Sequence, residues 1–181
     1  METLQAASKM VLEPVPRVGH RASARIYNGH VFPLNNVYAY ITVEHKLEDV
    51  LDPPEPYAAF ISKGHLCRVN EDRLCWSSTA PYSNPPVIDI YPGEKQSLDI
   101  VNIEDGEWIE IPSEKGWATS QDREILRRKR KDGNDDVKTS RVFLKPHKYT
   151  AKIKIVSKDT KAKEFKIEID PTDLNAPIKL H

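Results

Sequence analysis

The sequence has few cysteines, few glycines and no excess of either charge. Its 181 residues include two cysteines and seven glycines, and 27 Lys and Arg residues are matched by 27 Asp and Glu residues. A chain of this length buries about 70% of the surface that its unfolded state exposes, so it can fold without a disulfide or a metal. A formal net charge of zero disfavours non-specific binding to nucleic acid or to an anionic membrane surface, since both depend on a positive field.

Long apolar runs are absent as well. The first 12 residues contain Glu2, Gln5 and Lys9 and lack the continuous apolar stretch of a secretory signal. The chain also has no run of about 20 apolar residues of the kind that spans a membrane. We therefore expect a cytoplasmic protein with no membrane span. A chain trimmed of its signal or anchor would show the same pattern.

Proline, in contrast, is abundant. Seven of the 14 prolines cluster in the segments 14–16, 53–56 and 85–86. Such clusters interrupt helices and central strands, because proline lacks a backbone N–H and has a fixed φ. Many short elements separated by stiff turns are the expected result.

The runs between these clusters are rich in β-branched and aromatic residues, and they predict strands. In the clearest run, 37–43, one parity carries Val37, Ala39, Ile41 and Val43, which we expect to face the core. The other strands expected before residue 112 are Arg21–Tyr27, a hairpin of Ile61–Val69 with Arg73–Ser77, then Val87–Tyr91, Ser97–Val101 and Trp108–Ile111. The turns that separate them are expected at Asn28-Gly29, Pro92-Gly93-Glu94 and Glu104-Asp105-Gly106.

The last part of the chain predicts a long hairpin. Tyr149–Val156 and Phe165–Ile169 each have one apolar and one charged face, as in an antiparallel sheet that is solvated on one side. We expect Lys152 and Lys154 to pair across the strands with Glu164 and Glu168.

About nine short strands with turns at regular intervals predict an all-β protein, an immunoglobulin-like antiparallel β-sandwich. The sandwich is expected to span residues 17–170, after an N-terminal arm at 1–16 and before a C-terminal tail at 171–181. Residues 119–140 differ in composition and are interpreted as a polar insertion on the surface. Thr119 and Asp122 are spaced as in a capping box, so this insertion is expected to contain one short, exposed helix.

The order of several motifs resembles an immunoglobulin-like domain that is common in archaeal proteins and related to the adhesion-type domains called CARDB. The motifs are Asn28-Gly29, the run 37–43, Arg73-Leu74-Cys75-Trp76, Pro92-Gly93-Glu94 followed by Leu98-Asp99, and the closing hairpin. The resemblance covers residues 17–170. It implies a binding or structural module and transfers no catalytic residues.

The two cysteines, Cys67 and Cys75, lie on either side of an expected short turn. If that turn has three residues, they face each other on adjacent strands, where they would be small buried side chains, a disulfide, or part of a metal site with His65. The histidines His20 and His30 flank one expected strand. With His45 at the end of the next strand, they could approach one another in space, although histidines exposed at strand ends are the more common arrangement. No spacing typical of a metal or catalytic motif accompanies them, and we expect no cofactor.

The largest local charge asymmetry is a basic run, Arg127–Lys131, which is preceded by Arg123. It falls in the insertion, together with Asp132–Asp136, which would offset part of its field and which departs from a calcium loop at Val137 and Phe143. Trp76 and Trp108 are expected to fill the core, whereas Trp117 lies in an apparent loop. The candidate partner-binding residues are Trp117, Arg123, Arg127, Arg128, Lys129, Arg130 and Lys131.

These observations favour a non-enzymatic protein-interaction or structural module. Its candidate surface combines the Pro-rich loop 52–57 with the insertion around Trp117 and 123–131, because sandwiches usually place recognition on loops. The first alternative is a nucleic-acid-binding protein that uses the basic run. The second is a metal- or thiol-dependent enzyme at His65, Cys67 and Cys75.

Overall fold

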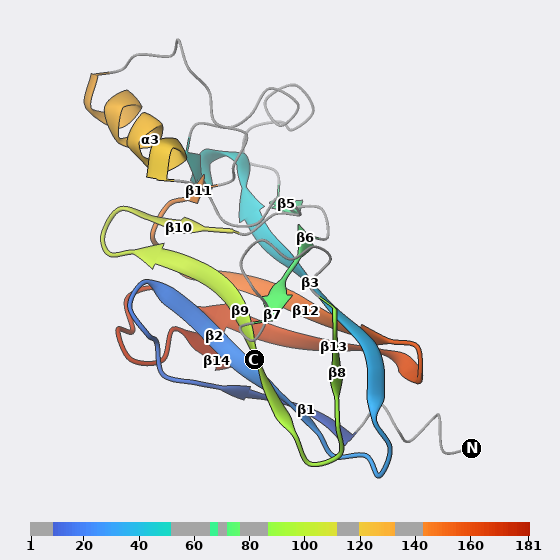
Figure 1. Cartoon of the computed structure of the whole chain (residues 1–181). Helices are drawn as coiled ribbons and strands as arrows, with labels where there is room; N and C mark the ends of the chain where they lie inside the picture. Colours follow the sequence, from blue (N-terminus) through green and yellow to red (C-terminus); the bar gives the residue numbers. More distant parts are fainter. Residues whose placement is uncertain (1–8, 52–65, 69–71, 77–86, 112–119, 133–142) are drawn as a thin grey trace.

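The computed structural model describes residues 9–51, 66–68, 72–76, 87–111, 120–132 and 143–181 (Figure 1). These residues form two antiparallel sheets that pack face to face, so the chain is an all-β sandwich. None of the helices in the described part has the length and apolar character that a membrane crossing requires.

The first sheet has the strand order β1-β2-β9-β10-β11-β4, with β7 paired to β9. Its strands are β1 (Met10–Pro14), β2 (Arg21–Asn28), β4 (Val50–Leu51), β7 (Cys75–Trp76), β9 (Lys95–Glu104), β10 (Trp108–Glu110) and β11 (Phe143–Leu144). The register of β2 against β9 shifts between Ala22 and Ser23, which marks a β-bulge.

The second sheet has the order β14-β13-β12-β3-β5, with β6 and β8 also paired to β3. Its strands are β3 (Leu34–Lys46), β5 (Leu66–Arg68), β6 (Asp72–Arg73), β8 (Ile88–Ile90), β12 (Tyr149–Ser157), β13 (Thr160–Ile169) and β14 (Ile178–Leu180). A short 3-10 helix, η2 (Leu47–Asp49), carries the chain from β3 into β4 of the first sheet.

The core lies between the sheets and follows the alternation expected of the strands. Val37, Ala39, Ile41 and Val43 are all buried, which confirms the inward parity predicted for this run. Trp76 is buried in the same core, and its indole Nε1 donates a hydrogen bond to the carbonyl oxygen of Val37 at 3.2 Å. The expected core role of Trp76 is therefore confirmed.

Turns occur where glycine was expected to permit them. Gly93 and Gly106 have φ values of 76° and 72°, in the left-handed region that glycine occupies at little cost. The Glu94 N–H donates to the Tyr91 carbonyl, and the Glu107 N–H donates to the Glu104 carbonyl, so each glycine sits inside a hydrogen-bonded turn.

The expected hairpin of 61–69 with 73–77 is wrong. β5 pairs with the end of β3, and β6 pairs with the middle of β3, so the two follow one another along the same neighbour. The chain then crosses to the first sheet, where β7 pairs with β9. Residues 61–65 and 77 lie outside the described part of the chain.

The ends of the chain also differ from expectation. Met10–Pro14, predicted as part of an arm, forms the edge strand β1, and Met10 and Leu12 are buried in the core. Ile178–Leu180, predicted as part of a tail, forms β14 beside β13. β1 buries Met10 and Leu12 and β14 buries Ile178, and this apolar burial is why both segments add to the sheets.

The closing hairpin is confirmed as β12 and β13, but half of its expected charge pairing is wrong. Lys154 lies opposite Glu164, as expected. Lys152 lies opposite Lys166, because Glu168 is in register with Thr150.

The expected helix is present as α3 (Ser120–Asp132), which packs on the outer face of the first sheet (Figure 1). Leu126 is buried there with Trp108 and Phe143 in a second apolar cluster, and Leu51 packs against it. Trp108 is thus buried, but beneath α3 and outside the main sandwich core.

Candidate functional site

The outer face of the first sheet carries an ordered row of side chains. Arg21 lies opposite Asn102, Asn102 lies opposite Glu110, and Glu110 lies opposite Phe143. Residues that are directly opposite one another in adjacent strands point to the same side of a sheet. The row therefore places an arginine, an amide, a carboxylate and an aromatic ring side by side; we call this surface the polar face.

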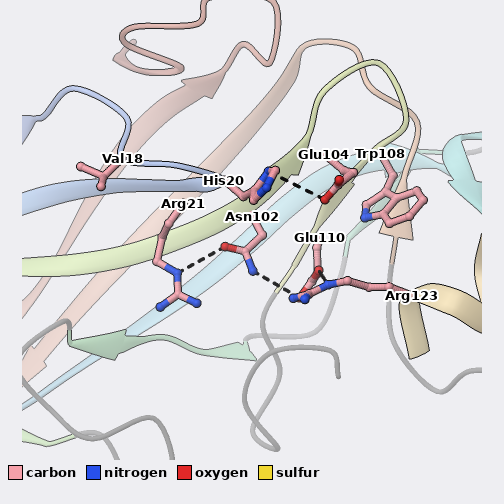
Figure 2. A pocket seen from close by; sticks show the side chains of 8 residues that line it. All are labelled: Val18, His20, Arg21, Asn102, Glu104, Trp108, Glu110 and Arg123. Atoms are coloured by element: carbon pink, nitrogen blue, oxygen red, sulfur yellow. Dashed lines mark hydrogen bonds and ion pairs between the residues drawn. The ribbon is translucent and has the colours of Figure 1, made fainter. Parts of the chain in front are cut away.

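Hydrogen bonds join β2 to β9 along this face (Figure 2). Ser23 Oγ donates to one oxygen of Asp99 at 3.0 Å, and Arg21 Nη1 donates to the other at 3.2 Å. The Arg21 Nε donates to the side-chain oxygen of Asn102 at 3.3 Å. Asn102 Nδ2 continues the chain to Glu110 Oε1 at 3.5 Å. These side chains hold one another in place.

The network ends in an ion pair between Glu110 and Arg123. The Glu110 side chain is only 1% exposed, and the guanidinium of Arg123 donates from Nε at 3.0 Å and from Nη2 at 3.1 Å to its two oxygens. These hydrogen bonds raise the pKa of Arg123, against the opposing effect of burial. Because Glu110 is buried in β10 and Arg123 is in α3, the pair fastens the helix to the sheet.

A second contact fixes the next turn of α3. Arg127 lies over the Trp108 ring, with its guanidinium carbon 5.1 Å from the ring centroid. Its Nη2 is 3.3 Å from Glu104 Oε1 and 3.7 Å from Glu107 Oε2. Trp108 in turn meets Phe143 edge to face, with ring centroids 5.6 Å apart. Apolar and ionic contacts together dock α3.

Three depressions lie along the polar face. One of about 300 Å³ is lined by Arg21, Asn102, Glu110 and their neighbours (Figure 2). Another, of about 420 Å³, lies between the β9–β10 turn and α3 and includes Lys131. The third, of about 480 Å³, follows β2 and β9 away from the helix. Their volumes fall within or near the range typical of ligand sites.

The structure changes the expected environment of the basic run. Arg123 is largely covered and Arg127 is half-exposed, and their partners are carboxylates of β9 and β10. Arg128 is exposed and pairs with Glu124 at 2.9 Å within the helix. Lys131 is exposed as expected. Lys129 and Arg130 lie in α3, but their side chains are outside the described part, as are Trp117 and residues 52–57.

The spacing of residues in the sequence was sufficient to predict which face of α3 docks on the sheet. Arg123, Leu126 and Arg127 are related by three and four residues, so they share one side of a helix. Glu110 stands at an outward position of an otherwise apolar strand, where a buried carboxylate requires a cationic partner. Sequence reasoning took this helix as solvated and missed the outward row of β2, β9 and β10.

The expected cysteine arrangement is wrong. Cys67 is in β5, opposite His45 in the second sheet, whereas Cys75 is in β7, opposite Asp99 in the first sheet. They are therefore not neighbours on adjacent strands. His30 and His45 lie near opposite ends of β3, so these two histidines do not approach one another. Among the described residues, no group of three His, Cys, Asp or Glu side chains is placed to hold a metal ion.

A smaller polar cluster joins the two connections between the sheets. His147 Nε2 lies 2.7 Å from Asp49 Oδ1 and 3.2 Å from the Tyr149 hydroxyl, which itself donates to the Lys145 carbonyl at 2.7 Å. The His147 and Tyr149 rings stack with centroids 4.5 Å apart. Burial alone would raise the pKa of Asp49, but the Lys46 N–H and His147 outweigh it, so that the pKa lies below its ordinary value.

Comparison with known proteins adds no relative. A scan against protein-family models finds no match to the chain, and a search of curated proteins finds no significantly similar sequence. The fold class of the chain, an antiparallel all-β sandwich, therefore comes from the structure itself, and the likeness to CARDB domains stays a prediction.

Proposed function

We propose that the protein is a non-enzymatic protein-binding β-sandwich and that the polar face, together with the exposed side of α3, is its binding surface. The observation that carries this proposal is the docking of α3. The Glu110–Arg123 pair and Leu126 hold the helix on a rigid sheet, beside depressions that remain open. A surface that is fixed before binding loses less conformational entropy when a partner arrives.

The exposed side of α3 fits a partner with acidic groups. Arg128 and Lys131 are exposed, and Arg127 is half-exposed beside the Trp108 ring. Carboxylates of the protein itself meet Arg123 and Arg127, so the basic run has less free charge than its sequence suggests. This partial neutralisation favours a protein partner over nucleic acid, whose binding depends on many uncompensated cations.

The thiol or metal alternative loses the arrangement on which it depended. Cys67 and Cys75 pair with strands of different sheets. In the described hydrogen bonds of the polar face, Ser23 contacts Asp99 and His20 contacts the carbonyl of Ile103, so this serine is not paired with a histidine.

The proposal is tested by capture from a lysate of the source organism with the immobilised full chain. Three forms are compared: the wild type, R128E/K131E on α3, and K152E/K154E on the outer face of the second sheet as a matched control. Quantitative mass spectrometry should show proteins enriched by the wild type and by the control but reduced at least fivefold by R128E/K131E. Direct binding of one enriched, purified protein should follow the same order.

Two outcomes would contradict this function. If R128E/K131E captured the same proteins as the wild type in equal amounts, α3 would not be part of the binding surface. Tight, strongly salt-dependent binding of a mixed-sequence oligonucleotide, abolished by R128E/K131E while no protein is enriched, would favour the nucleic-acid alternative.

A further inference from the structure

The largest of the three depressions is a groove on β2 that the proposed function leaves without a ligand. Its floor includes Arg21, Ser23 and Arg25, which alternate with the buried residues Ala22, Ala24 and Ile26. Its wall is formed by Val15, Pro16 and Val18 from the connection between β1 and β2. A cationic floor thus lies beside an apolar wall.

Among the described residues that line this groove, two arginines outnumber one carboxylate, so their net charge is positive. Asp99 also lines the groove, but its side chain is only 8% exposed and accepts hydrogen bonds from Arg21 and Ser23. The Arg21 side chain is 40% exposed, and Arg25 is exposed. The carboxylate thus lies below the guanidinium of Arg21 and orients it.

Arg25 has a carboxylate nearby but does not use it. Glu13 lies opposite Arg25 in the register of β1 and β2, yet Glu13 pairs with Lys95 at 3.0 Å. Within the residues that the structure describes, Arg25 makes no ion pair. Its guanidinium is therefore available for a planar, bidentate contact with an external carboxylate.

The wall of the groove is fixed by contacts of its own. Arg17 donates two hydrogen bonds to Asp105, at 2.7 and 3.0 Å, and a third to the carbonyl of Gly19 at 2.7 Å. Val18 and Arg21 exchange backbone hydrogen bonds of 3.2 and 3.0 Å. Val18 as a residue is nevertheless 80% exposed. The apolar side chain of Val18 is therefore held in a solvent-exposed position in the groove that Arg21 and Arg25 also line.

We propose that this groove binds an extended, acidic segment of a partner protein, with carboxylates that reach Arg21 and Arg25 and an apolar side chain that packs against Pro16 and Val18. The proposal rests on the proposed function and names the partner chemistry for the same face. Arg21 and Arg25 are four residues apart in a strand, about 13–14 Å, so a segment extended along β2 matches them with acidic residues four positions apart. Recognition of acidic segments by clustered arginines is a common mode of peptide binding.

The lining of the groove distinguishes this partner from nucleic acid. The wall offers aliphatic side chains, and the described residues that line the groove include no aromatic ring on which a base would stack. Arg21 and Arg25 are also too few to hold a phosphate chain without further cations.

The test is a selection from a random dodecapeptide display library with the full-length protein as bait. We expect the enriched peptides to carry two Asp or Glu residues, most often four positions apart, with an apolar residue between them. The best peptide is then synthesised in its acidic form and with Gln and Asn in place of the acids, and fluorescence anisotropy measures its affinity for four proteins. These are the wild type, R25Q, V18S and the control K152Q/K154Q.

The acidic peptide should bind R25Q about tenfold, and V18S about threefold, more weakly than it binds the wild type. The amide peptide should bind the wild type at least tenfold more weakly than the acidic peptide does. The control should bind like the wild type. Enrichment of uncharged or basic peptides, no enrichment at all, or unchanged affinity of R25Q would overturn the groove proposal. Capture that depends on α3 would survive each of these results, so failure of the groove is distinguishable from failure of the proposed function.

Discussion

Removing the Arg123 guanidinium is the perturbation that most directly weakens the docking of α3. Arg123→Ala removes both guanidinium hydrogen bonds from the Glu110 carboxylate, which is only 1% exposed. Loss of one partner of a fully buried ion pair costs roughly 3–5 kcal/mol. The Arg123 side chain is 28% exposed, so water can reach part of the site. We therefore expect Arg123→Ala to lower the free energy of unfolding by about 2–3 kcal/mol, which lowers the melting temperature by roughly 5–10 °C for a chain of this size.

The assay is urea unfolding followed by tryptophan fluorescence, because Trp108 lies beneath α3. Replacing both partners, as in E110M/R123M, removes the buried charges together and should recover most of the lost stability. R128A breaks only the exposed pair with Glu124 and should cost less than about 0.5 kcal/mol. The reasoning would be refuted if R123A lost less than about 0.5 kcal/mol of stability. It would also be refuted if the loss in E110M/R123M equalled the sum of the losses from the two single substitutions.

Three further predictions concern acid stability and one turn. The pKa of Asp49 is depressed, so its carboxylate stabilises the fold above its ordinary pKa of 3.8, and this contribution is lost as the pH falls through the folded value. Urea unfolding of Asp49→Asn and of the wild type between pH 3 and 7 measures this contribution. The urea midpoint of Asp49→Asn should be lower than that of the wild type near pH 6, and the two should converge near pH 3. Burial, with Lys9 and Lys163 nearby, lowers the pKa of His30 and favours its neutral form in the fold, so the wild type should lose stability as the pH falls below about 6.5. Between pH 7 and 5, His30→Gln should lose less stability than the wild type. An equal dependence of stability on pH in the two proteins would disprove this assignment. Gly93→Ala introduces strain at a φ of 76° without a steric clash, and calorimetry should show a fall of about 2–4 °C, corresponding to about 1 kcal/mol.

The parts of the fold that depend on local pattern could be predicted. Alternation in the run 37–43 and in the closing hairpin identified buried and exposed faces, because the side-chain period of a strand is two residues. The turns at Gly93 and Gly106 followed from the conformational freedom of glycine. Each of these signals lies within a few residues of sequence.

The parts that depend on pairing between distant strands could not be predicted. β5, β6 and β7 have two or three residues each, and they pair with β3 or β9 through tertiary context that their own sequence does not encode. The same holds for the polar face, whose row from Arg21 to Phe143 requires the register of four strands and a bulge. The basic run was identified as the candidate site, but its docking onto Glu110 needed the structure.

The central claim is that partners bind the polar face of the first sheet and α3. Its most direct test is a set of ¹H–¹⁵N correlation spectra of the full chain, recorded during titration with a protein or peptide that it has been shown to bind. The largest shift changes should fall in β2, in β9 and β10, and in α3. Changes concentrated instead in β12 and β13 of the second sheet would contradict the claim.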